Sequence, residues 1–141
     1  MTSIASSTRA NAVVVDASAL IEFIKNGAAA AAIGERLFER RLLLYAPAII
    51  DLEVLNALRR FVLFEEMKLA DAEAALHAYP SIPIVRFAHD HLYHRIWQLR
   101  GNFTAYDAAY VALAEGMEIP LITLDARLAK AAPPTIRVEL F

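Results

Sequence analysis

The sequence predicts a single α/β domain, a three-layer α/β/α sandwich with a mainly parallel central sheet. Short apolar segments of strand length alternate along the chain with longer segments of helical periodicity. Most of the predicted strands are continuous apolar runs, as expected for strands that are covered on both faces. The length of 141 residues allows one sizeable core and leaves no room for a second.

The first half of the chain alternates valine- or leucine-rich runs with amphipathic segments. Three valines before Asp16 predict a buried strand, and Ser18 is placed to cap the next helix, which Asn26 and Gly27 end. Pro47 is placed to open a long helix with an apolar stripe. In chain order the predicted elements are strand 12–16, helix 18–24, helix 28–40, strand 42–45 and helix 47–62.

The second half continues the alternation. Pro80 and Pro83 bracket a turn, and Gly101 breaks a helix. Thr104 is placed to cap a helix that is almost wholly apolar and is therefore expected to be buried. In chain order the predicted elements are helix 69–79, strand 84–87, helix 89–99, helix 105–116, strand 121–124, a short helix, and strand 135–140.

Composition indicates the extent of the domain and the compartment in which it works. We expect residues 1–11, which are rich in Ser and Thr, to form a flexible tail, and residues 12–141 to form the single domain. No signal peptide or membrane-spanning run is predicted, and the absence of cysteine fits a reducing compartment, so we expect a cytoplasmic protein. Hydrophobic residues make up 58 % of the chain, which suggests spare apolar surface for a homodimer or another constant partner.

Composition also excludes some chemistry. A chain without cysteine has no disulfide, no thiolate metal site and no cysteine nucleophile. A net charge of −2 gives no global positive field to attract nucleic acid, so RNA or DNA binding would depend on local cations and on metal. The candidate cations are Lys25, Arg40, Arg41, Arg59, Arg60, Arg127 and Lys130.

Four acidic residues each stand where a predicted strand ends or on a predicted helix near its start: Asp16, Glu53, Asp107 and Asp125. In open parallel sheets the carboxyl ends of the strands form the ligand site. Carboxylates gathered there would repel one another unless a cation neutralised them, and oxygen ligands favour Mg²⁺ or Mn²⁺. The pattern therefore points to metal-assisted chemistry on a phosphate ester.

Each of these residues also has a purely structural interpretation when it is taken alone. The two strand-ending aspartates fit turns, and Thr104 with Asp107 resembles a helix capping box. Glu53 shares a helix face with Asn56 and Arg60, which fits a solvated polar stripe. Only the joint pattern and its order favour a site.

Four segments carry a resemblance to the PIN-domain family and, within it, to the VapC-type toxins of toxin–antitoxin pairs. The segments are Val-Val-Asp16-Ala-Ser18-Ala-Leu, Glu53-Val-Leu-Asn56-Ala-Leu, Thr104-Ala-Tyr-Asp107-Ala-Ala-Tyr-Val-Ala-Leu-Ala and Pro120-Leu-Ile-Thr-Leu-Asp125. They span nearly the whole chain in the family's order, and none of the four acids departs from the pattern.

The resemblance implies a PIN-like fold and an endoribonuclease that depends on Mg²⁺ or Mn²⁺ and is neutralised by a VapB-like antitoxin. By that resemblance Asp16, Glu53, Asp107 and Asp125 form the metal-binding and catalytic quartet, with Thr104 and Ser18 in support. A metal-activated water would then hydrolyse the RNA phosphodiester bond and leave a 5′-phosphate and a 3′-hydroxyl. The loops that select the RNA show no family pattern.

Two other groups of residues are candidates for function. His89, His91 and His94 do not follow the spacing of paired helical ligands, so a metal role is disfavoured. Tyr93 and Trp97 lie one helical turn apart, a spacing that favours a place in the core or in a protein interface over a base-stacking platform.

Two alternatives stay open. A different Mg²⁺-dependent phosphate hydrolase is possible, although a haloacid dehalogenase-like phosphatase would need an Asp where this chain has Ser18, and a phosphoacceptor receiver would need further adjacent acids. A non-catalytic PIN-like module that binds RNA or protein is the second alternative, and the complete set of acids argues against it.

Overall fold

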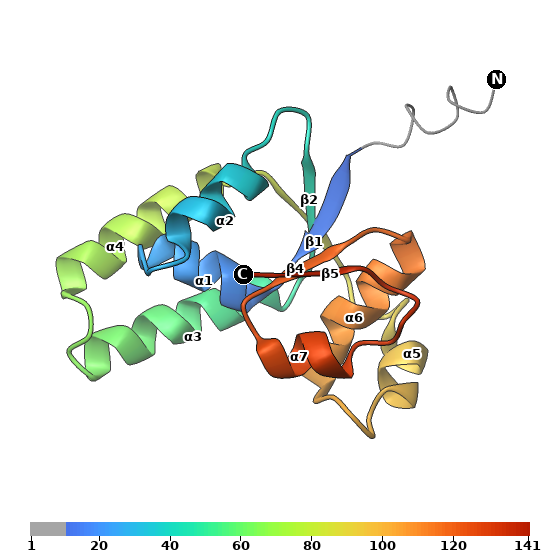
Figure 1. The fold of residues 1–141 in the computed structure, drawn as a ribbon. Helices are drawn as coiled ribbons and strands as arrows, with labels where there is room; N and C mark the ends of the chain where they lie inside the picture. Colours follow the sequence, from blue (N-terminus) through green and yellow to red (C-terminus); the bar gives the residue numbers. More distant parts are fainter. Residues whose placement is uncertain (1–10) are drawn as a thin grey trace.

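The structure is a computed structural model that describes residues 11–141. Figure 1 shows a central sheet with helices on both sides. The sheet has five strands in the order β3-β2-β1-β4-β5, and every neighbouring pair is parallel. The predicted fold class, an α/β/α sandwich with a parallel sheet, is confirmed. The tail predicted for residues 1–11 lies, except for Asn11, outside the described residues.

The strands and helices alternate as the sequence predicts. The strands are β1 (Ala12–Val15), β2 (Leu43–Pro47), β3 (Ile84–Phe87), β4 (Leu121–Thr123) and β5 (Val138–Leu140). The helices are α1 (Ala17–Ile24), α2 (Ala30–Leu37), α3 (Ile50–Leu63), α4 (Leu69–Ala78), the 3₁₀ helix η1 (Tyr79–Ser81), α5 (Tyr93–Gln98), α6 (Ala105–Met117) and α7 (Ala126–Ala131). In the described part of the chain, no helix is both long and apolar enough to cross a lipid bilayer.

Three predicted boundaries are wrong for identifiable reasons. Pro47 does not open a helix; it is the last residue of β2, paired with Phe87, and α3 begins three residues later. The helix predicted from position 89 begins only at Tyr93, because residues 89–92 form a turn closed by the hydrogen bond from the N–H of Leu92 to the carbonyl of His89. The last strand starts at residue 138, where its pairing with the short strand β4 begins.

The core lies on both faces of the two central strands. The valines of β1 are fully buried, and the stretch Ala108–Ala114 of α6, which packs on β1, β2 and β4, is also buried. This confirms the predicted burial of the apolar helix. On the other side α1 contacts β4 and also packs against α2 and α3, while α3 and α4 run side by side away from the sheet (Figure 1).

The parallel register brings distant segments together at one sheet edge. Val15 pairs with Ile122, and the N–H of Asp16 donates to the carbonyl of Ile122 at 2.8 Å. The chain therefore leaves β1 and β4 at the same edge, which places Asp16 beside the segment that leads to Asp125. The same edge of a parallel sheet receives the start of the helices that follow each strand.

Candidate active site

Asp16 is the best-buried acid of the predicted site, with 5 % of its surface exposed. Its Oδ2 accepts hydrogen bonds from Ser18 Oγ at 2.6 Å and from Thr123 Oγ1 at 2.8 Å. Within residues 11–141 no hydrogen bond reaches Oδ1, so one carboxylate oxygen keeps its acceptor capacity. Two hydroxyls on two different elements therefore fix the direction of this side chain.

Ser18 does not cap α1, because Asp16 occupies the N-cap position and Ser18 lies inside the first turn. Its hydroxyl donates to Asp16 and accepts from the backbone N–H of Leu124 at 2.9 Å. Thr123 makes a similar pair of contacts: its hydroxyl donates to Asp16 and accepts from the backbone N–H of Asp125 at 3.0 Å. The two hydroxyls tie the end of β1 to the end of β4.

Glu53 projects from the first turns of α3 toward α6. Its Oε1 accepts a hydrogen bond from the hydroxyl of Tyr110 at 2.6 Å, and the Tyr110 ring is fully buried. Burial and the neighbouring Glu53 carboxylate raise the pKa of Tyr110, so the phenol keeps its proton and donates. A residue of the buried core thereby holds Glu53 in place.

Asp107 lies at the third position of α6, as the predicted capping box requires. Thr104 is the N-cap residue, and its Oγ1 accepts from the N–H of Asp107 at 3.2 Å. The predicted cap is confirmed, and it leaves the Asp107 carboxylate half-buried at the start of a rigid, buried helix. The charge of Arg127, from the first turn of α7, lowers the pKa of Asp107.

Asp125 is the N-cap of α7. Its Oδ1 accepts from the backbone N–H of Arg127 at 2.9 Å and of Leu128 at 3.3 Å. The structural interpretation of Asp125 as a helix cap is therefore correct. The same residue also lies close enough to Asp16 and Asp107 for its charge to raise the pKa of both.

We name the four acids the acidic cluster, and in three of them, Asp16, Glu53 and Asp107, the fold disfavours the ionised form. Burial raises the pKa of Asp16 above its usual range, and the charges of Asp107 and Asp125 raise it further against the lowering effect of the two hydroxyls. Burial also raises the pKa of Glu53, with contributions from Asp16 and Asp107. The pKa of Asp107 is raised by burial and then by Asp125. Four distant parts of the chain thus meet electrostatically at one place.

The donor chemistry of the acidic cluster suits a hard divalent cation. All of its potential ligands are carboxylate or hydroxyl oxygens, and a nearby positive charge would lower the raised pKa values of Asp16, Glu53 and Asp107. In the present conformation no three acidic or histidine side chains of residues 11–141 form a ready-made ligand set. The cluster fits Mg²⁺ or Mn²⁺ by donor type and charge, and ligation would need side-chain adjustment.

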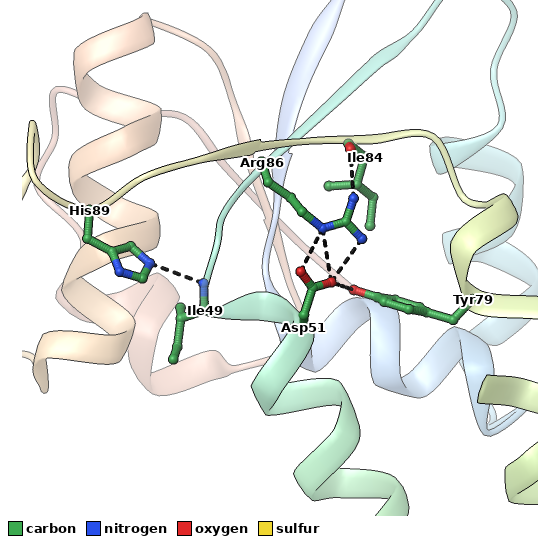
Figure 2. A network of polar contacts seen from close by, with 6 residues as sticks. All are labelled: Ile49, Asp51, Tyr79, Ile84, Arg86 and His89. Atoms are coloured by element: carbon green, nitrogen blue, oxygen red, sulfur yellow. Dashed lines mark hydrogen bonds and ion pairs between the residues drawn. The ribbon is translucent and has the colours of Figure 1, made fainter. Parts of the chain in front are cut away.

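Asp51, two residues before Glu53, belongs to a different network. Arg86 of β3 donates to both of its carboxylate oxygens, at 2.7 Å to Oδ2 and 2.9 Å to Oδ1, and the hydroxyl of Tyr79 donates to Oδ1 at 2.9 Å (Figure 2). Nearby in Figure 2, His89 accepts from Ile49 at the start of the same helix. These contacts fix the start of α3, and with it the segment that carries Glu53.

The remaining candidate residues lie beside the acidic cluster or outside it. Asn56 lines a hollow of about 380 Å³ together with Glu53, whereas Arg60 does not line it. His89, as an acceptor for Ile49, has a structural role, and no histidine of the described residues joins the acidic cluster. The sequence interpretation missed Tyr110 as the partner of Glu53. Its spacing of three residues from Asp107 on a predicted helix was the available signal.

Comparisons with known proteins agree with this geometry. The sequence model of the PIN domain matches residues 13–133. The chain is 44 % identical over 128 residues to "Ribonuclease VapC1" of Mycobacterium tuberculosis, and the match covers 90 % of this chain and 96 % of that protein.

Two solved structures share the fold. The crystal structure of VapC20 of Mycobacterium tuberculosis, described as a sarcin-ricin loop cleaving toxin, matches with a TM-score of 0.67 and 16 % identity, over 89 % of this chain and 98 % of that one. That of VapBC2 from Rickettsia felis, bound to a DNA fragment from its promoter, matches with a TM-score of 0.63 and 15 % identity, over 92 % and 98 %. With the acidic cluster, the shared fold and the VapC1 relative in agreement, the chain belongs to the PIN-domain family and, within it, to the VapC-type proteins.

Proposed function

We propose that this protein is a metal-dependent endoribonuclease that acts as the toxin of a type II toxin–antitoxin pair. The observation that carries the proposal is the gathering of four acidic side chains from distant segments at one edge of a parallel sheet. The ribonuclease name of its relative VapC1 supports the nuclease activity, and the toxin description of the VapC20 structure supports the biological role.

Asp16, Glu53, Asp107 and Asp125 are the residues that would hold the cation. When bound, Mg²⁺ or Mn²⁺ supplies charge neutralisation at the scissile phosphate and lowers the pKa of water. The reaction is hydrolysis of the P–O3′ bond: the oxygen of water bonds to phosphorus, and O3′ leaves and takes a proton. The products carry a 5′-phosphate and a 3′-hydroxyl.

The chain's own residues set the geometry for this reaction. Ser18 and Thr123 direct one oxygen of Asp16 by hydrogen bonds and leave the other without a protein donor among the described residues. Tyr110 directs Glu53 in the same manner, again through one oxygen. Fixed carboxylates of this kind cost little reorganisation when the substrate arrives, which is how preorganised sites lower a barrier.

The test is cleavage of an end-labelled RNA pool by purified protein with Mg²⁺, with Mn²⁺ and with a chelator. Asp16→Asn and Asp107→Asn, checked for folding, run alongside. We expect cleavage that needs metal, disappears in both variants and leaves 5′-phosphate ends. A 2′,3′-cyclic phosphate, or cleavage that survives both substitutions, would reject the mechanism. Metal binding without cleavage of any RNA would favour a non-catalytic binding module, and hydrolysis of small phosphate esters would favour another phosphate hydrolase.

The proposed partner is a VapB-like antitoxin, a proposal that the VapBC2 complex supports by analogy. An apolar hollow of about 280 Å³ between α3 and α4 suits an apolar antitoxin segment, and its lining includes Leu55, Leu63 and Leu69. We expect Leu69→Asp to lose co-purification with the antitoxin and to keep RNA cleavage. Leu140→Asp, on the edge strand β5, is the matched control and should keep both.

A further inference from the structure

Hydroxyl groups donate hydrogen bonds to Asp16 and to Glu53, and each carboxylate receives them on a single oxygen. Ser18 and Thr123 both donate to Oδ2 of Asp16, at 2.6 and 2.8 Å. Tyr110 donates to Oε1 of Glu53 at 2.6 Å. Among the residues that the structure describes, no donor reaches Oδ1 of Asp16 or Oε2 of Glu53. Each of these two acids therefore has one oxygen bound within the protein and one left for a ligand.

The two hydroxyls at Asp16 are themselves oriented by the backbone. The N–H of Leu124 donates to Ser18 at 2.9 Å. The N–H of Asp125 donates to Thr123 at 3.0 Å. A hydroxyl has one proton and two acceptor lone pairs, so each hydroxyl can accept from the backbone and still give its proton to Asp16. The two hydroxyl oxygens also lie 3.1 Å apart, but the charged carboxylate is closer to both and is the stronger acceptor.

Oδ2 of Asp16 thus has both of its acceptor sites filled. Asp16 and Thr123 are both buried, so a hydrogen bond lost between them is costly and is not readily replaced by one to water. Tyr110, whose ring is fully buried, acts on Glu53 from the core in the same manner. A cation that took both oxygens of either acid would compete with these protons for an oxygen already in use.

We propose that the hydroxyls of Ser18, Thr123 and Tyr110 determine the cation selectivity of the acidic cluster, by limiting Asp16 and Glu53 to one ligand oxygen each. The proposal rests on the metal-dependent function proposed above and deepens it by assigning positioning residues to the site. Ca²⁺ takes about six to eight oxygen ligands and often uses both oxygens of a carboxylate, whereas the smaller Mg²⁺ requires nearly octahedral geometry and keeps several waters. Carboxylates that offer one oxygen therefore suit Mg²⁺ and withhold ligands from Ca²⁺.

A purely structural role is the competing interpretation, because Ser18 and Thr123 also join the end of β1 to the end of β4. Loss of a structural tie would weaken the binding of every cation by a similar factor. Loss of a restraint on one carboxylate oxygen would instead favour Ca²⁺, since this cation gains most from a second ligand oxygen. The ratio of the Kd for Ca²⁺ to the Kd for Mg²⁺ therefore separates the two roles, and the absolute affinity does not.

The test measures cation binding to the full-length protein in the absence of RNA. The electron paramagnetic resonance signal of free Mn²⁺ reports how much Mn²⁺ is bound, and bound Mn²⁺ is then displaced with Mg²⁺ or with Ca²⁺. Both dissociation constants, and hence their ratio, follow from the same reporter ion. We expect Mg²⁺ to displace Mn²⁺ from the wild type at lower concentrations than Ca²⁺ does.

Tyr110→Phe and Thr123→Val remove one hydroxyl each and keep most of the side-chain shape. We expect each variant to lower the ratio of Kd for Ca²⁺ to Kd for Mg²⁺ by about two- to ten-fold, the range that one net hydrogen bond is worth. Thr123→Ser keeps the hydroxyl and should keep the ratio. Tyr79→Phe is the matched control for Tyr110→Phe, because it removes another buried tyrosine hydroxyl that donates to an acid of α3, Asp51, at 2.9 Å. The control should leave the ratio unchanged.

The outcomes divide as follows, with folding checked by circular dichroism. A lower ratio in either hydroxyl variant, with Thr123→Ser and Tyr79→Phe unchanged, supports the proposal. An unchanged ratio in both Tyr110→Phe and Thr123→Val overturns it whatever the absolute affinity, and so does a wild type that prefers Ca²⁺. If one of the two variants does not fold, the other decides. These results leave the ribonuclease function intact if the wild type cleaves RNA with Mg²⁺, whereas a wild type that binds no Mn²⁺ would remove the metal site on which both proposals rest.

Discussion

Asp51 and Glu53 stand two residues apart on α3 and show opposite electrostatics. Arg86 and Tyr79 donate hydrogen bonds to Asp51, and the hydrogen bonds from Arg86 are the main reason that the pKa of Asp51 is lowered (Figure 2). Burial raises the pKa of Glu53, and Asp16 and Asp107 add to that rise. One helix turn thus presents an acid that stabilises the fold and an acid whose ionised form the fold disfavours.

The difference distinguishes a carboxylate that is paired within the fold from one that is a candidate for function. A carboxylate with a bidentate arginine has its charge satisfied within the protein. Neighbouring carboxylates that have no cationic partner carry negative charge that the folded chain does not neutralise, and groups of this kind are common at functional sites. Each prediction below tests whether the two residues differ in the way that their surroundings imply.

The largest expected effect is on cleavage. Glu53→Gln keeps the shape and the hydrogen bond from Tyr110 but removes a charge of the acidic cluster, so we expect RNA cleavage to fall by at least about 100-fold. Asp51→Asn should change the cleavage rate by less than about three-fold, because Asp51 lies outside the cluster. Rates on one RNA at saturating metal, with folding checked by circular dichroism, measure both. Equal losses would mean that the two acids do not differ in role.

Stabilisation by a divalent cation is expected to be the next largest effect. A ligand that binds only the folded protein stabilises it by about 2.7 kcal/mol at a concentration of 100 times its Kd. We therefore expect Mg²⁺ or Mn²⁺ to raise the thermal midpoint of the wild type and of Asp51→Asn. The midpoint of Glu53→Gln should respond only at higher metal concentrations. A thermal scan over a metal titration is the measurement, and equal responses from all three proteins would contradict it.

In the absence of metal, we expect Asp51→Asn to lower the free energy of unfolding more than Glu53→Gln does. Asp51→Asn leaves the Arg86 guanidinium without its charged acceptor and weakens the bond from the buried Tyr79, so we expect a loss of about 1–2 kcal/mol. Glu53→Gln should cost less than this or raise stability. Denaturant unfolding in chelator measures both. Asp71→Asn, an exposed acid in the first turn of α4 with no ion pair in the described structure, is the control and should have almost no effect.

The fold was predictable because its signals are local. Apolar runs, Pro and Gly breaks and the Thr104 cap each act within a few residues, and a parallel sheet with helices on both faces follows from their alternation. Tyr93 and Trp97, in contrast, are 58 % and 67 % exposed, so they do not lie in the core, and this was not predictable in the same way. Helical spacing marks a common face, but only tertiary structure decides whether another element covers it, and α5 packs mainly on α6.

The site was predictable in its acids and less so in their support. Strand ends and helix starts identify Asp16, Glu53, Asp107 and Asp125 as candidates because a parallel sheet collects them at one edge. The hydroxyl of Tyr110 meets Glu53 across 57 positions of sequence, and Arg86 meets Asp51 across 35. No local pattern in the sequence reports such pairs, because each joins residues that only the tertiary structure brings together.

The smallest expected effect is on the pH dependence of stability in metal-free protein. The raised pKa values of Asp16, Glu53 and Asp107 mean that the folded protein binds these protons more tightly than the unfolded chain does. Their contribution to stability is complete below the ordinary carboxyl pKa and is lost as pH rises through the raised folded values. Asp51, with its lowered pKa, contributes above the ordinary value and loses its contribution as pH falls through the folded value.

Stability of the wild type in chelator should therefore rise as the solution is acidified from about pH 7 toward about pH 5, and fall at lower pH as the paired acids are protonated. Asp16→Asn removes one of the three carboxyl groups with a raised pKa. It should reduce the slope of stability against pH between about pH 7 and about pH 5 by at most about 1.4 kcal/mol per pH unit. Asp51→Asn should leave that part unchanged and flatten the fall at low pH. Denaturant unfolding at half-unit pH steps measures all three curves. A wild type whose stability falls from neutral pH downward would mean that the acids of the cluster are already compensated, and that they resemble Asp51 after all.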